Sequence, residues 1–536
     1  MRFASRRIRV AILLLCTVVL CLGQESRGTL SGRITDTSGA VLRDARVQAV
    51  NTQTGASADS RSNDAGLFNL PFLLPGVYEV NVELAGFKKL NRKGIEVRVN
   101  DNVQLNLELS LGDVSQTVEV TAATPLLQTG ESSLGQVVDT KRMTELPVAS
   151  GNPAELVTLA PGTIRTTSIQ INKAAFNSGT SSVTTDGNSV NSNEFSIDGV
   201  PNTFAAGSSP RIAFSAPQAA IGEFKVMTTF YDASIGHTPG SVINTITSSG
   251  TNRFHGEVHE FLGGSFLNAP DLFVNRAGQK KALYQDNRYG GSINGPVILP
   301  KIYHGENKTF FSYVWEGNKW GTPQTLLSTV PTDAEKRGDL SALLKLGSQY
   351  QIYDPNSTVA LPNGQFQRSP VPNNVIPTSR LDPVALAMAK YWPEPNSAGK
   401  ADGSSNFTVA TRSREDYWVN FLRIDQNFSD RNRMFVRLDY DQWFERENLW
   451  FNNPAAGIDN HRTNRGLAID EVYVLSTNTI LNLRYGITQQ DFPENRESQG
   501  FDLSSLGFSS NLTNLVAKNL ATFPNTSFSS LLGLGR

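Results

Sequence analysis

The feature that most constrains this chain is the strict alternation of residue type over residues 433–444. The even positions are Met434, Val436, Leu438, Tyr440, Gln442 and Phe444, and the odd positions are Arg433, Phe435, Arg437, Asp439, Asp441 and Trp443. A period of two is that of a β-strand, so one face is mainly apolar and the other carries charges. Such a strand suits the wall of a transmembrane barrel with a wet interior, although a soluble antiparallel sheet with one buried face gives the same alternation.

The same pattern recurs later in the chain. The apolar set is Leu481, Leu483, Tyr485 and Ile487, and it alternates with Asn482, Arg484, Gly486 and Thr488. Short connections at residues 429–432 and 476–479 favour tight turns between antiparallel neighbours. Turns this short face the periplasm in outer-membrane barrels.

Residues 1–23 are typical of a secretory signal, because four arginines precede an apolar run at 10–22. This run is shorter than the roughly 20 residues that cross a bilayer. Both cysteines, Cys16 and Cys21, lie inside it, which excludes disulfides, thiol nucleophiles and thiolate metal sites from the mature chain. No later segment offers 18 consecutive apolar residues, so a mature chain that spans a membrane must do so as a β-barrel.

Charge and composition narrow the function classes. The 48 basic and 49 acidic residues leave a net charge of -1, so we expect no nucleic-acid partner. With 44 Gly and 26 Pro, the chain favours many strands joined by turns. We therefore predict a multidomain, mainly β protein.

Residues 26–110 alternate in short runs separated by turn residues, which predicts a small Ig-like β-sandwich of about seven strands. Gly32, Gly39, residues 63–68, residues 75–78 and residues 85–87 resemble the carboxypeptidase-regulatory-like domain. The resemblance implies a fold of the carbohydrate-binding-like class, but a fold does not establish sugar binding. Sugar binding and a purely accessory role therefore both stay open.

Three aromatic residues of this sandwich bear on that question. Phe68, Tyr78 and Phe87 each lie beside a turn. We expect these side chains to pack into the core rather than form a platform for stacking sugars.

Residues 111–123 form a linker that contains an extended segment, and we expect this strand to be unpaired and open to strand addition by a partner. The segment resembles a TonB box, the short periplasmic strand through which outer-membrane receptors engage their energy-coupling protein. A plain linker is the alternative. The candidate residues are Thr117, Val118, Glu119, Val120, Thr121 and Ala122.

Residues 124–250 combine helix and strand patterns, with short helices predicted at 139–146 and 152–159. Asp198-Gly199 predicts a turn, and residues 241–247 alternate as a half-buried strand does. The order resembles the plug domain of TonB-dependent receptors, which implies an α+β plug. The matching positions are Ile197, Asp198, Gly199, Val200, Pro201, Gly240, Asn244, Thr247 and Gly250, with a departure at Thr247-Ser248-Ser249, where Thr-Lys is frequent in the family.

Residues 251–536 are predicted to form an antiparallel transmembrane β-barrel whose first wall strand begins at Arg253. A long insert at 321–415 interrupts it, and so long an insert is more often functional. We predict an extracellular loop with one helix after Thr332, capped by Glu335, and another from Asp382 to Tyr391. Residues 266–273, 289–296 and 309–317 are similar to the Oar-like subgroup of these receptors.

The barrel is predicted to be incomplete. Residues 251–536 number 286, and taking away the 95 residues of the loop leaves 191. At about 20 residues per strand and connection, this gives roughly ten strands, whereas plugged transporters have about 22. We therefore expect the chain to be truncated.

No catalytic, cofactor or metal site is predicted. The five histidines are His237, His255, His259, His304 and His461, and HGEVH at 255–259 departs from the helical zinc-protease spacing. On a strand, positions four apart are separated by about 13 Å, too far to share one metal ion. Phosphate-loop and nucleophile-elbow motifs do not occur in the sequence.

Taken over the whole chain, the resemblance implies a TonB-dependent receptor of a Gram-negative outer membrane. Such a receptor moves a siderophore, oligosaccharide or peptide, and its partners are a TonB-type energy-coupling protein, outer-membrane lipid and a small-molecule, glycan or peptide ligand. One alternative is a cell-surface carbohydrate-binding or adhesion protein. Another is a channel for protein export, since the sequence does not separate import from export.

Overall fold

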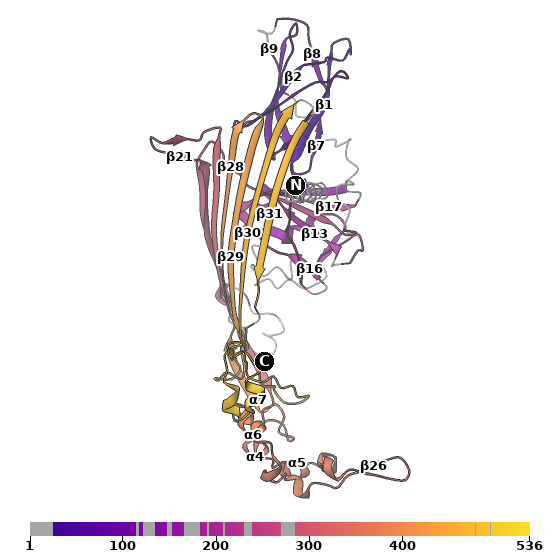
Figure 1. The fold of residues 1–536 in the computed structure, drawn as a ribbon, viewed down its shortest axis with the longest axis vertical. Helices are drawn as coiled ribbons and strands as arrows, with labels where there is room; N and C mark the ends of the chain where they lie inside the picture. The colour runs from indigo at the N-terminus through magenta and orange to yellow at the C-terminus, as the bar shows by residue number, and fades with distance from the viewer. Residues whose placement is uncertain are drawn as a thin grey trace, which may run out of the picture.

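The computed structural model describes residues 25–113, 117–121, 134–146, 153–165, 183–189, 192–206, 209–229, 238–267, 269, 285–476, 479–493 and 495–535. Residues 1–23, Ala122 and His237 of the sequence predictions lie outside the described residues. As predicted, the fold is mainly β, with a small sandwich, a mixed plug sheet and a long antiparallel wall (Figure 1). Across these residues, no helix combines the length and the apolar character needed to cross a membrane.

The N-terminal sandwich has two sheets. One has the order β4-β1-β7 with β8 beside β1, and the other has the order β3-β2-β5-β6-β9. Phe68 and Tyr78 are buried in the core and Phe87 packs against it, which confirms the expectation for these rings. The strands are β1 (Gly28–Asp36), β2 (Arg46–Asn51), β3 (Ser57–Arg61), β4 (Leu67–Leu73), β5 (Gly76–Glu83), β6 (Lys89–Val97), β7 (Asn102–Gln104), β8 (Leu107–Leu109) and β9 (Thr117–Thr121).

Strand β9 corrects one prediction, because the segment expected to be unpaired is paired. It runs parallel to β6, with Lys89 opposite Thr117 and Lys93 opposite Thr121. Lys93 also forms an ion pair with Glu119. Pairing satisfies backbone groups that an isolated strand leaves to water. Because β9 ends the sheet order, its other side is a sheet edge.

The plug is organised around a five-stranded sheet of order β10-β17-β18-β13-β14, in which β13 runs parallel to β18. Helix α2 confirms the first predicted helix, and the second is the 3₁₀ helix η1. The elements are β10 (Leu134–Asp139), α2 (Thr140–Glu145), η1 (Pro153–Leu159), β11 (Thr163–Arg165), β12 (Val183–Thr185), β13 (Glu194–Ile197), β14 (Val200–Pro201), β15 (Thr203–Ala206), β16 (Ser209–Ile212), η3 (Gln218–Ala220), β17 (Ile221–Thr229) and β18 (Val242–Thr247).

Strand β18 was expected to be half-buried, and this prediction is wrong. Two of its three polar residues are as buried as its apolar ones, with Asn244 at 0% and Thr247 at 4% exposure, and Thr245 is partly buried. Asn244 contacts Asn100 of the sandwich, and Thr247 contacts Arg423 of the wall. The sequence pattern of the strand alone cannot show such covering by other domains.

The wall is a seven-stranded antiparallel sheet whose strands follow sequence order. It consists of β19 (His255–Gly264), β20 (Gln285–Pro296), β23 (Thr309–Gly321), β28 (Arg414–Ser429), β29 (Asn432–Glu447), β30 (Ile458–Ser476) and β31 (Thr479–Asp491), with the side hairpin β21 (Ile298–Leu299) and β22 (Tyr303–His304). The prediction of roughly ten strands is wrong, because strands reach 19 residues and the described residues after 491 form no wall strand. Within the described residues the sheet is open, with β19 and β31 as its edges.

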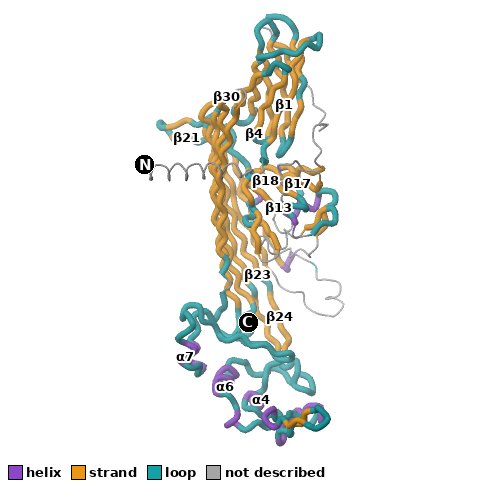
Figure 2. The backbone as a smooth tube through the Cα atoms, turned by 45° about the vertical axis from the view of Figure 1, so that its right-hand side comes forward, coloured by secondary structure: helices purple, strands orange, loops and turns teal. Residues whose placement is uncertain are grey.

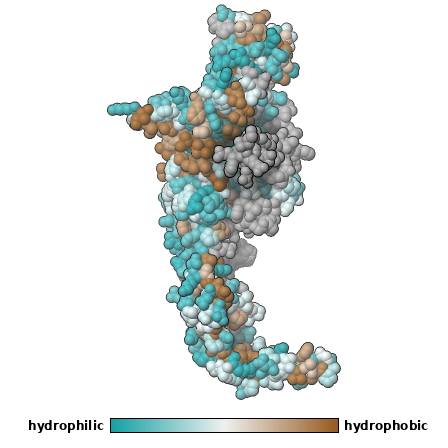
Figure 3. Space-filling model, viewed as in Figure 1, coloured by the Kyte–Doolittle hydropathy of each residue, from teal (hydrophilic) through white to brown (hydrophobic). Residues whose placement is uncertain are grey.

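The alternation of the wall strands is confirmed. Leu438 faces outward at 46% exposure, whereas its neighbours Arg437 and Asp439 face inward and are buried. The inward face is not a wet lumen along its whole length, because the plug packs against it (Figure 2). Hydrophobic residues gather on the part of the wall nearer the sandwich (Figure 3).

The connections at the far end of the wall fold together into what we call the head, residues 322–413, 448–457 and 492–535. Its core includes Val330, Phe407, Phe451 and Phe523. Both predicted helices are confirmed, the first with a capping box between Thr332 and Glu335. The elements are β24 (Pro323–Ser328), α4 (Asp333–Lys336), α5 (Ser341–Leu344), η5 (Ser348–Tyr350), η6 (Pro355–Ser357), β25 (Val359–Ala360), β26 (Phe366–Gln367), η7 (Pro372–Asn374), η8 (Thr378–Arg380), α6 (Pro383–Ala389), β27 (Phe407–Arg412), η9 (Leu503–Leu506) and α7 (Ser510–Thr513).

Two predicted boundaries shift. Helix α6 ends at Ala389 rather than Tyr391, and the first wall strand begins at His255 rather than Arg253. Strands β24 and β27 pair with each other, so the ends of the predicted loop continue the hairpin of β23 and β28. The head and the sandwich lie at opposite ends of the wall (Figure 1).

Candidate functional site

The site is built around the turn between β13 and β14. Asp198 and Gly199 have φ values of 51° and 73°, and Ile197 pairs with Val200 across the turn. Positive φ at both central positions is what an Asp-Gly hairpin turn favours, as the sequence predicted. The turn points Asp198 at the inward face of the wall, where its side chain is buried.

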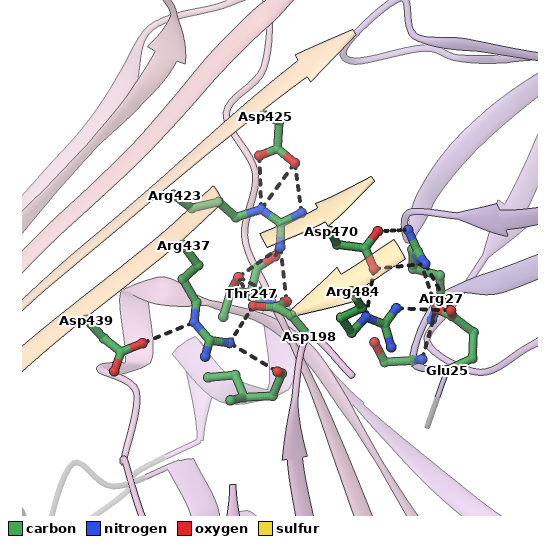
Figure 4. A network of polar contacts seen from close by, with 12 residues as sticks. Glu25, Arg27, Asp198, Thr247, Arg423, Asp425, Arg437, Asp439, Asp470 and Arg484 are labelled. Carbon is green, nitrogen blue, oxygen red and sulfur yellow. Dashed lines mark hydrogen bonds and ion pairs between the residues drawn. The ribbon is translucent and has the colours of Figure 1, made fainter. Parts of the chain in front are cut away.

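Two arginines of the wall hold the two oxygens of Asp198. Arg423 Nη1 donates to Oδ1 at 3.0 Å, and Arg437 Nη1 donates to Oδ2 at 2.8 Å (Figure 4). Arg423 and Arg437 lie directly opposite each other on β28 and β29. Like charges in this position repel, so a carboxylate between them offsets the repulsion.

Each arginine has a second carboxylate two residues further along its own strand. Arg423 Nη2 donates to Asp425 at 2.8 Å, and Arg437 Nε donates to Asp439 at 3.1 Å. We call these five residues (Asp198, Arg423, Asp425, Arg437 and Asp439) the plug clamp. Because both guanidinium groups are almost fully buried, losing a partner is costly, and the plug turn is firmly positioned against the wall.

Thr247 completes the surroundings of Asp198. Its backbone N–H donates to Asp198 Oδ1 at 2.9 Å, and its hydroxyl contacts both carboxylate oxygens. Burial raises the pKa of Asp198, but attraction to Arg423 and Arg437 and the hydrogen bond from Thr247 outweigh it. The pKa therefore lies below its ordinary value, and the carboxylate is charged at neutral pH.

A second set of charges joins the sandwich to the wall. Arg27 Nη1 donates to Asp470 at 2.7 Å and Arg27 Nε to Glu25 at 2.7 Å. Arg484 closes the set, with Nε donating to Asp470 at 2.7 Å and Nη2 to Glu25 at 3.1 Å. We call Glu25, Arg27, Asp470 and Arg484 the charge ring (Figure 4).

The charge ring and the plug clamp meet at one turn. Arg484 Nη1 also donates to the carbonyl oxygen of Gly199 at 3.3 Å. Burial raises the pKa of Glu25, but attraction and hydrogen bonds from Arg27 and attraction to Arg484 bring it down to about 2. Sandwich, plug and wall are thus connected through ionised side chains.

The structure brings together part of the predicted plug signature. Ile197, Val200 and Asn244 lie buried in the same sheet as Asp198, Gly199 and Thr247, while Pro201 is exposed on β14. A Cβ atom on Gly240 would lie 2.3 Å from the carbonyl of Ser192, and one on Gly250 would lie 2.5 Å from that of Phe311. Both glycines therefore sit where the backbone approaches its neighbours closely.

The TonB-box candidate lies apart from this cluster. Strand β9 belongs to the sandwich, at the end of the molecule remote from the head (Figure 1), and its pairing with β6 keeps Thr117–Thr121 there. The two predicted sets of site residues therefore lie in separate parts of the molecule.

Sequence reasoning identified none of the arginines as plug contacts. A signal was present, because Arg-x-Asp occurs at 423–425 and again at 437–439, with Arg and Asp at inward positions of adjacent strands. Glu25 and Arg27 carry no comparable pattern, since they follow the predicted signal directly and their partners on the wall are more than 400 residues away.

The head contains a cavity of about 380 Å³ near the ends of β29 and β30. Its lining includes Asn448, Trp450, Arg496 and Asn525, with Leu532 among the apolar residues. Among the described residues, the guanidinium of Arg496 and the indole N–H of Trp450 have no hydrogen-bond partner. Both groups are therefore free to donate to a molecule in the cavity.

The described ranges hold no group of three His, Cys, Asp or Glu side chains placed to bind a metal ion. His255 and His259 lie on strand β19, where their spacing keeps them from sharing a metal. His304 is on β22 and His461 on β30.

Residues 246–536, more than half of the chain, match the family model of the outer membrane beta barrel domain. The chain belongs to this outer-membrane barrel family. The family places the protein in the outer membrane of a Gram-negative bacterium. Residues 29–110, which form the sandwich, match the carboxypeptidase regulatory-like domain.

The chain is also similar to an individual relative, at low sequence identity. Over 251 residues it is 26% identical to the TonB-dependent transporter Oar of Myxococcus xanthus, a match that covers 44% of this chain and 22% of the transporter. The chain thus spans about a fifth of the length of this curated relative.

The chain is also similar to two solved structures. The outer-membrane transporter YddB from Escherichia coli has a TM-score of 0.41 and 13% identity, covering 66% of this chain and 38% of YddB. A ferric enterobactin receptor (PfeA) mutant from Pseudomonas aeruginosa has a TM-score of 0.36 and 12% identity, covering 68% of this chain and 42% of the receptor.

Proposed function

We propose that this protein is a TonB-dependent outer-membrane receptor that moves a siderophore, an oligosaccharide or a peptide across the membrane. The observation that carries the proposal is the plug clamp. A separate folded sheet sits against the inward face of a membrane wall, and side-chain ion pairs hold its turn between β13 and β14 there. Water can solvate such groups when they part, so the contact is suited to a plug that moves.

The comparison with Oar supports the same function, because that relative is named a TonB-dependent transporter. Enzymatic activity is not part of the proposal, since Oar is named a transporter.

We assign ligand capture to the head and the adjoining outer end of the plug. The cavity beside Trp450 and Arg496 supports this assignment, because it combines an aromatic ring, apolar residues and two unpaired donors. Most residues that line the cavity belong to the head, which lies at the opposite end of the wall from the sandwich (Figure 1), so a ligand and a periplasmic partner would act from opposite sides.

We assign the contact with a TonB-type coupling protein to residues 117–122. The support is the free edge of β9, which can accept a partner strand while the other edge stays paired with β6. Strand addition of this kind relies on backbone hydrogen bonds, so it tolerates varied side chains.

Two proline variants test this assignment. Successive N–H groups of a strand point to opposite edges, so Val118→Pro and Glu119→Pro remove donors from different edges of β9. We expect one of them to weaken binding of the periplasmic domain of a TonB-type protein at least tenfold in a pull-down titration with the full chain. Val118→Ala and Glu119→Ala are the matched controls and should bind normally. Unchanged binding by both proline variants would remove residues 117–122 from the proposal.

A further inference from the structure

The sandwich contacts the plug directly through its loop at residues 98–101. Lys225 Nζ of β17 donates to the carbonyl oxygen of Asn100 at 3.0 Å. Asn244 Nδ2 of β18 donates to Asn100 Oδ1 at 2.9 Å. Lys225 and Asn244 are both buried, so the loop covers the centre of the plug sheet.

The same sandwich also contacts the wall at points that do not involve the plug. Arg433 Nη2 of β29 donates to the carbonyl oxygen of Phe72 at 2.6 Å. Ser57 Oγ of β3 donates to Asp430, in the turn between β28 and β29, at 2.6 Å. The sandwich therefore contacts both the plug and the wall directly, in addition to its covalent connection to the plug through the linker.

The charge ring is the strongest part of this bridge. Arg27 is 6% exposed and the side chain of Asp470 is 1% exposed, so their ion pair crosses a dry boundary between sandwich and wall. Phe72 packs over the Arg27 guanidinium, 4.8 Å from its ring centre. Charged hydrogen bonds in such surroundings are stronger than those at a surface.

Departure of the sandwich would reach the plug turn. Arg484, which holds the carbonyl of Gly199, would lose Glu25, and Asp470 would lose Arg27. Lys225 and Asn244 would lose their contacts with Asn100 at the same time. The plug would then keep its clamp to Arg423 and Arg437 but lose the cover on its opposite side.

We propose that the N-terminal sandwich is a latch: while docked, it holds the plug in the wall, and it must undock before the plug moves. This inference rests on the proposed function for the need to move the plug. The latch itself is a property of the resting protein and does not depend on the identity of ligand or partner. It gives the sandwich a role that its fold alone does not reveal.

A disulfide between sandwich and wall tests the latch. The side-chain oxygens of Ser57 and Asp430 are 2.6 Å apart, and the two native cysteines lie within residues 1–23. The double substitution Ser57→Cys with Asp430→Cys therefore introduces one reversible bond that does not touch the plug, and we call it the docking disulfide. Hydrogen exchange of β13, β14 and β18 in the full chain reports how freely the plug opens.

The second variant opens the charge ring. We expect Arg27→Gln to speed amide exchange in β13, β14 and β18 at least about threefold, while exchange in β28 and β29 stays unchanged. Adding the oxidised docking disulfide should restore the slow exchange, and reduction should reverse the rescue. Arg46→Gln is the matched control, because the guanidinium of Arg46 pairs with Asp59 within the sandwich.

Two outcomes would overturn the latch. In one, Arg27→Gln slows formation of the docking disulfide, which shows undocking, yet plug exchange stays as in the parent protein. In the other, Arg27→Gln changes neither docking nor exchange. Failure of the proline variants to affect partner binding bears on the receptor assignment and leaves this exchange result intact.

Discussion

Asp198 shows how one side chain can decide the position of a whole domain. It lies between two arginines that face each other on neighbouring strands, and it comes from a different part of the fold. The arginines keep Asp425 and Asp439 whatever the plug does. The wall is therefore prepared to receive a carboxylate without depending on it for its own charge balance.

The first prediction concerns this carboxylate. Asp198→Asn keeps the shape of the side chain and removes its charge, so Arg423 and Arg437 lose their shared partner. We expect the plug to be destabilised by about 2–3 kcal/mol, below the roughly 3–5 kcal/mol typical of an orphaned buried charge, because each arginine retains one aspartate. Urea-induced unfolding of the plug, followed by exchange in β18, measures the effect.

The control for this variant is Asp59→Asn, which removes a carboxylate from an exposed ion pair with Arg46. Exposed pairs contribute little, so its effect should be much smaller. Equal losses in the two variants would show that the plug clamp does not hold the plug.

The second prediction uses the pH response of Glu223, on β17 beside the sandwich loop. Burial and repulsion from Asp101 raise its pKa from 4.5 to about 8, although Arg98 acts in the opposite direction. Because the pKa of this acid is raised, its protonated form stabilises the contact between the sandwich loop and the plug. This stabilisation is complete below pH 4.5, weakens as the pH rises, and is lost above about pH 8. Docking of the sandwich should therefore be weaker at about pH 9 than at about pH 6.

The rate at which the docking disulfide forms, at fixed thiolate concentration, measures this docking. Glu223→Gln should abolish the difference between the two pH values, because it cannot ionise. A pH dependence that survives in Glu223→Gln would assign the effect to another group.

At the scale of elements, the wall strands separate two environments residue by residue. The third prediction places a charge on the apolar side: Leu438→Lys, at an outward position of β29. We expect a loss of about 2–4 kcal/mol on folding into lipid vesicles, as for lysine near the middle of a bilayer. Gln489→Lys, outward on β31 opposite Arg465, is the control and should lose much less, because Asp491 lies beside both positions and offsets the repulsion from Arg465. Similar losses for both would mean that the apolar band is misplaced.

Two strands have surroundings that differ from those predicted from their own sequences. Strand β9 looks like a free segment because it lies in the linker between two domains, but β6 pairs with it along the edge of the sandwich sheet. Strand β18 looks half-buried because its residues alternate, but the sandwich and the wall cover its polar side. In both cases the missing information lies in another part of the fold.

At the scale of the whole molecule, the head has a hydrophobic core of its own, separate from that of the plug. The fourth prediction is that Phe523→Ala, which empties a site 1% exposed in the head core, destabilises the head by about 3–5 kcal/mol. Exchange should rise in β24, α6 and β27 and stay unchanged in the plug and in β28. Leu515→Ala is the control, since Leu515 is 84% exposed. Faster exchange in the plug as well would show that head and plug open together.

Much of this architecture could be predicted from sequence, for identifiable reasons. The alternation over 433–444 determines which side chains face inward, because a strand has a period of two. The Asp198-Gly199 turn follows from the backbone freedom of those two residues. Prediction failed where contacts are distant: Arg27 and Asp470 are 443 residues apart, and the number of wall strands depends on strand lengths that no local pattern sets.

The lengths of β29 and β30, 16 and 19 residues, exceed the roughly 9–11 residues that cross a bilayer. At about 3.3 Å per residue and a tilt near 45°, these strands rise roughly 35–45 Å, well above an apolar band about 25 Å tall. Toward the head, the outward side of the wall is polar, as the ion pair of Arg465 on β30 with Asp491 on β31 shows. With the head facing outward, as we propose for ligand capture, strands of these lengths carry it beyond the apolar band.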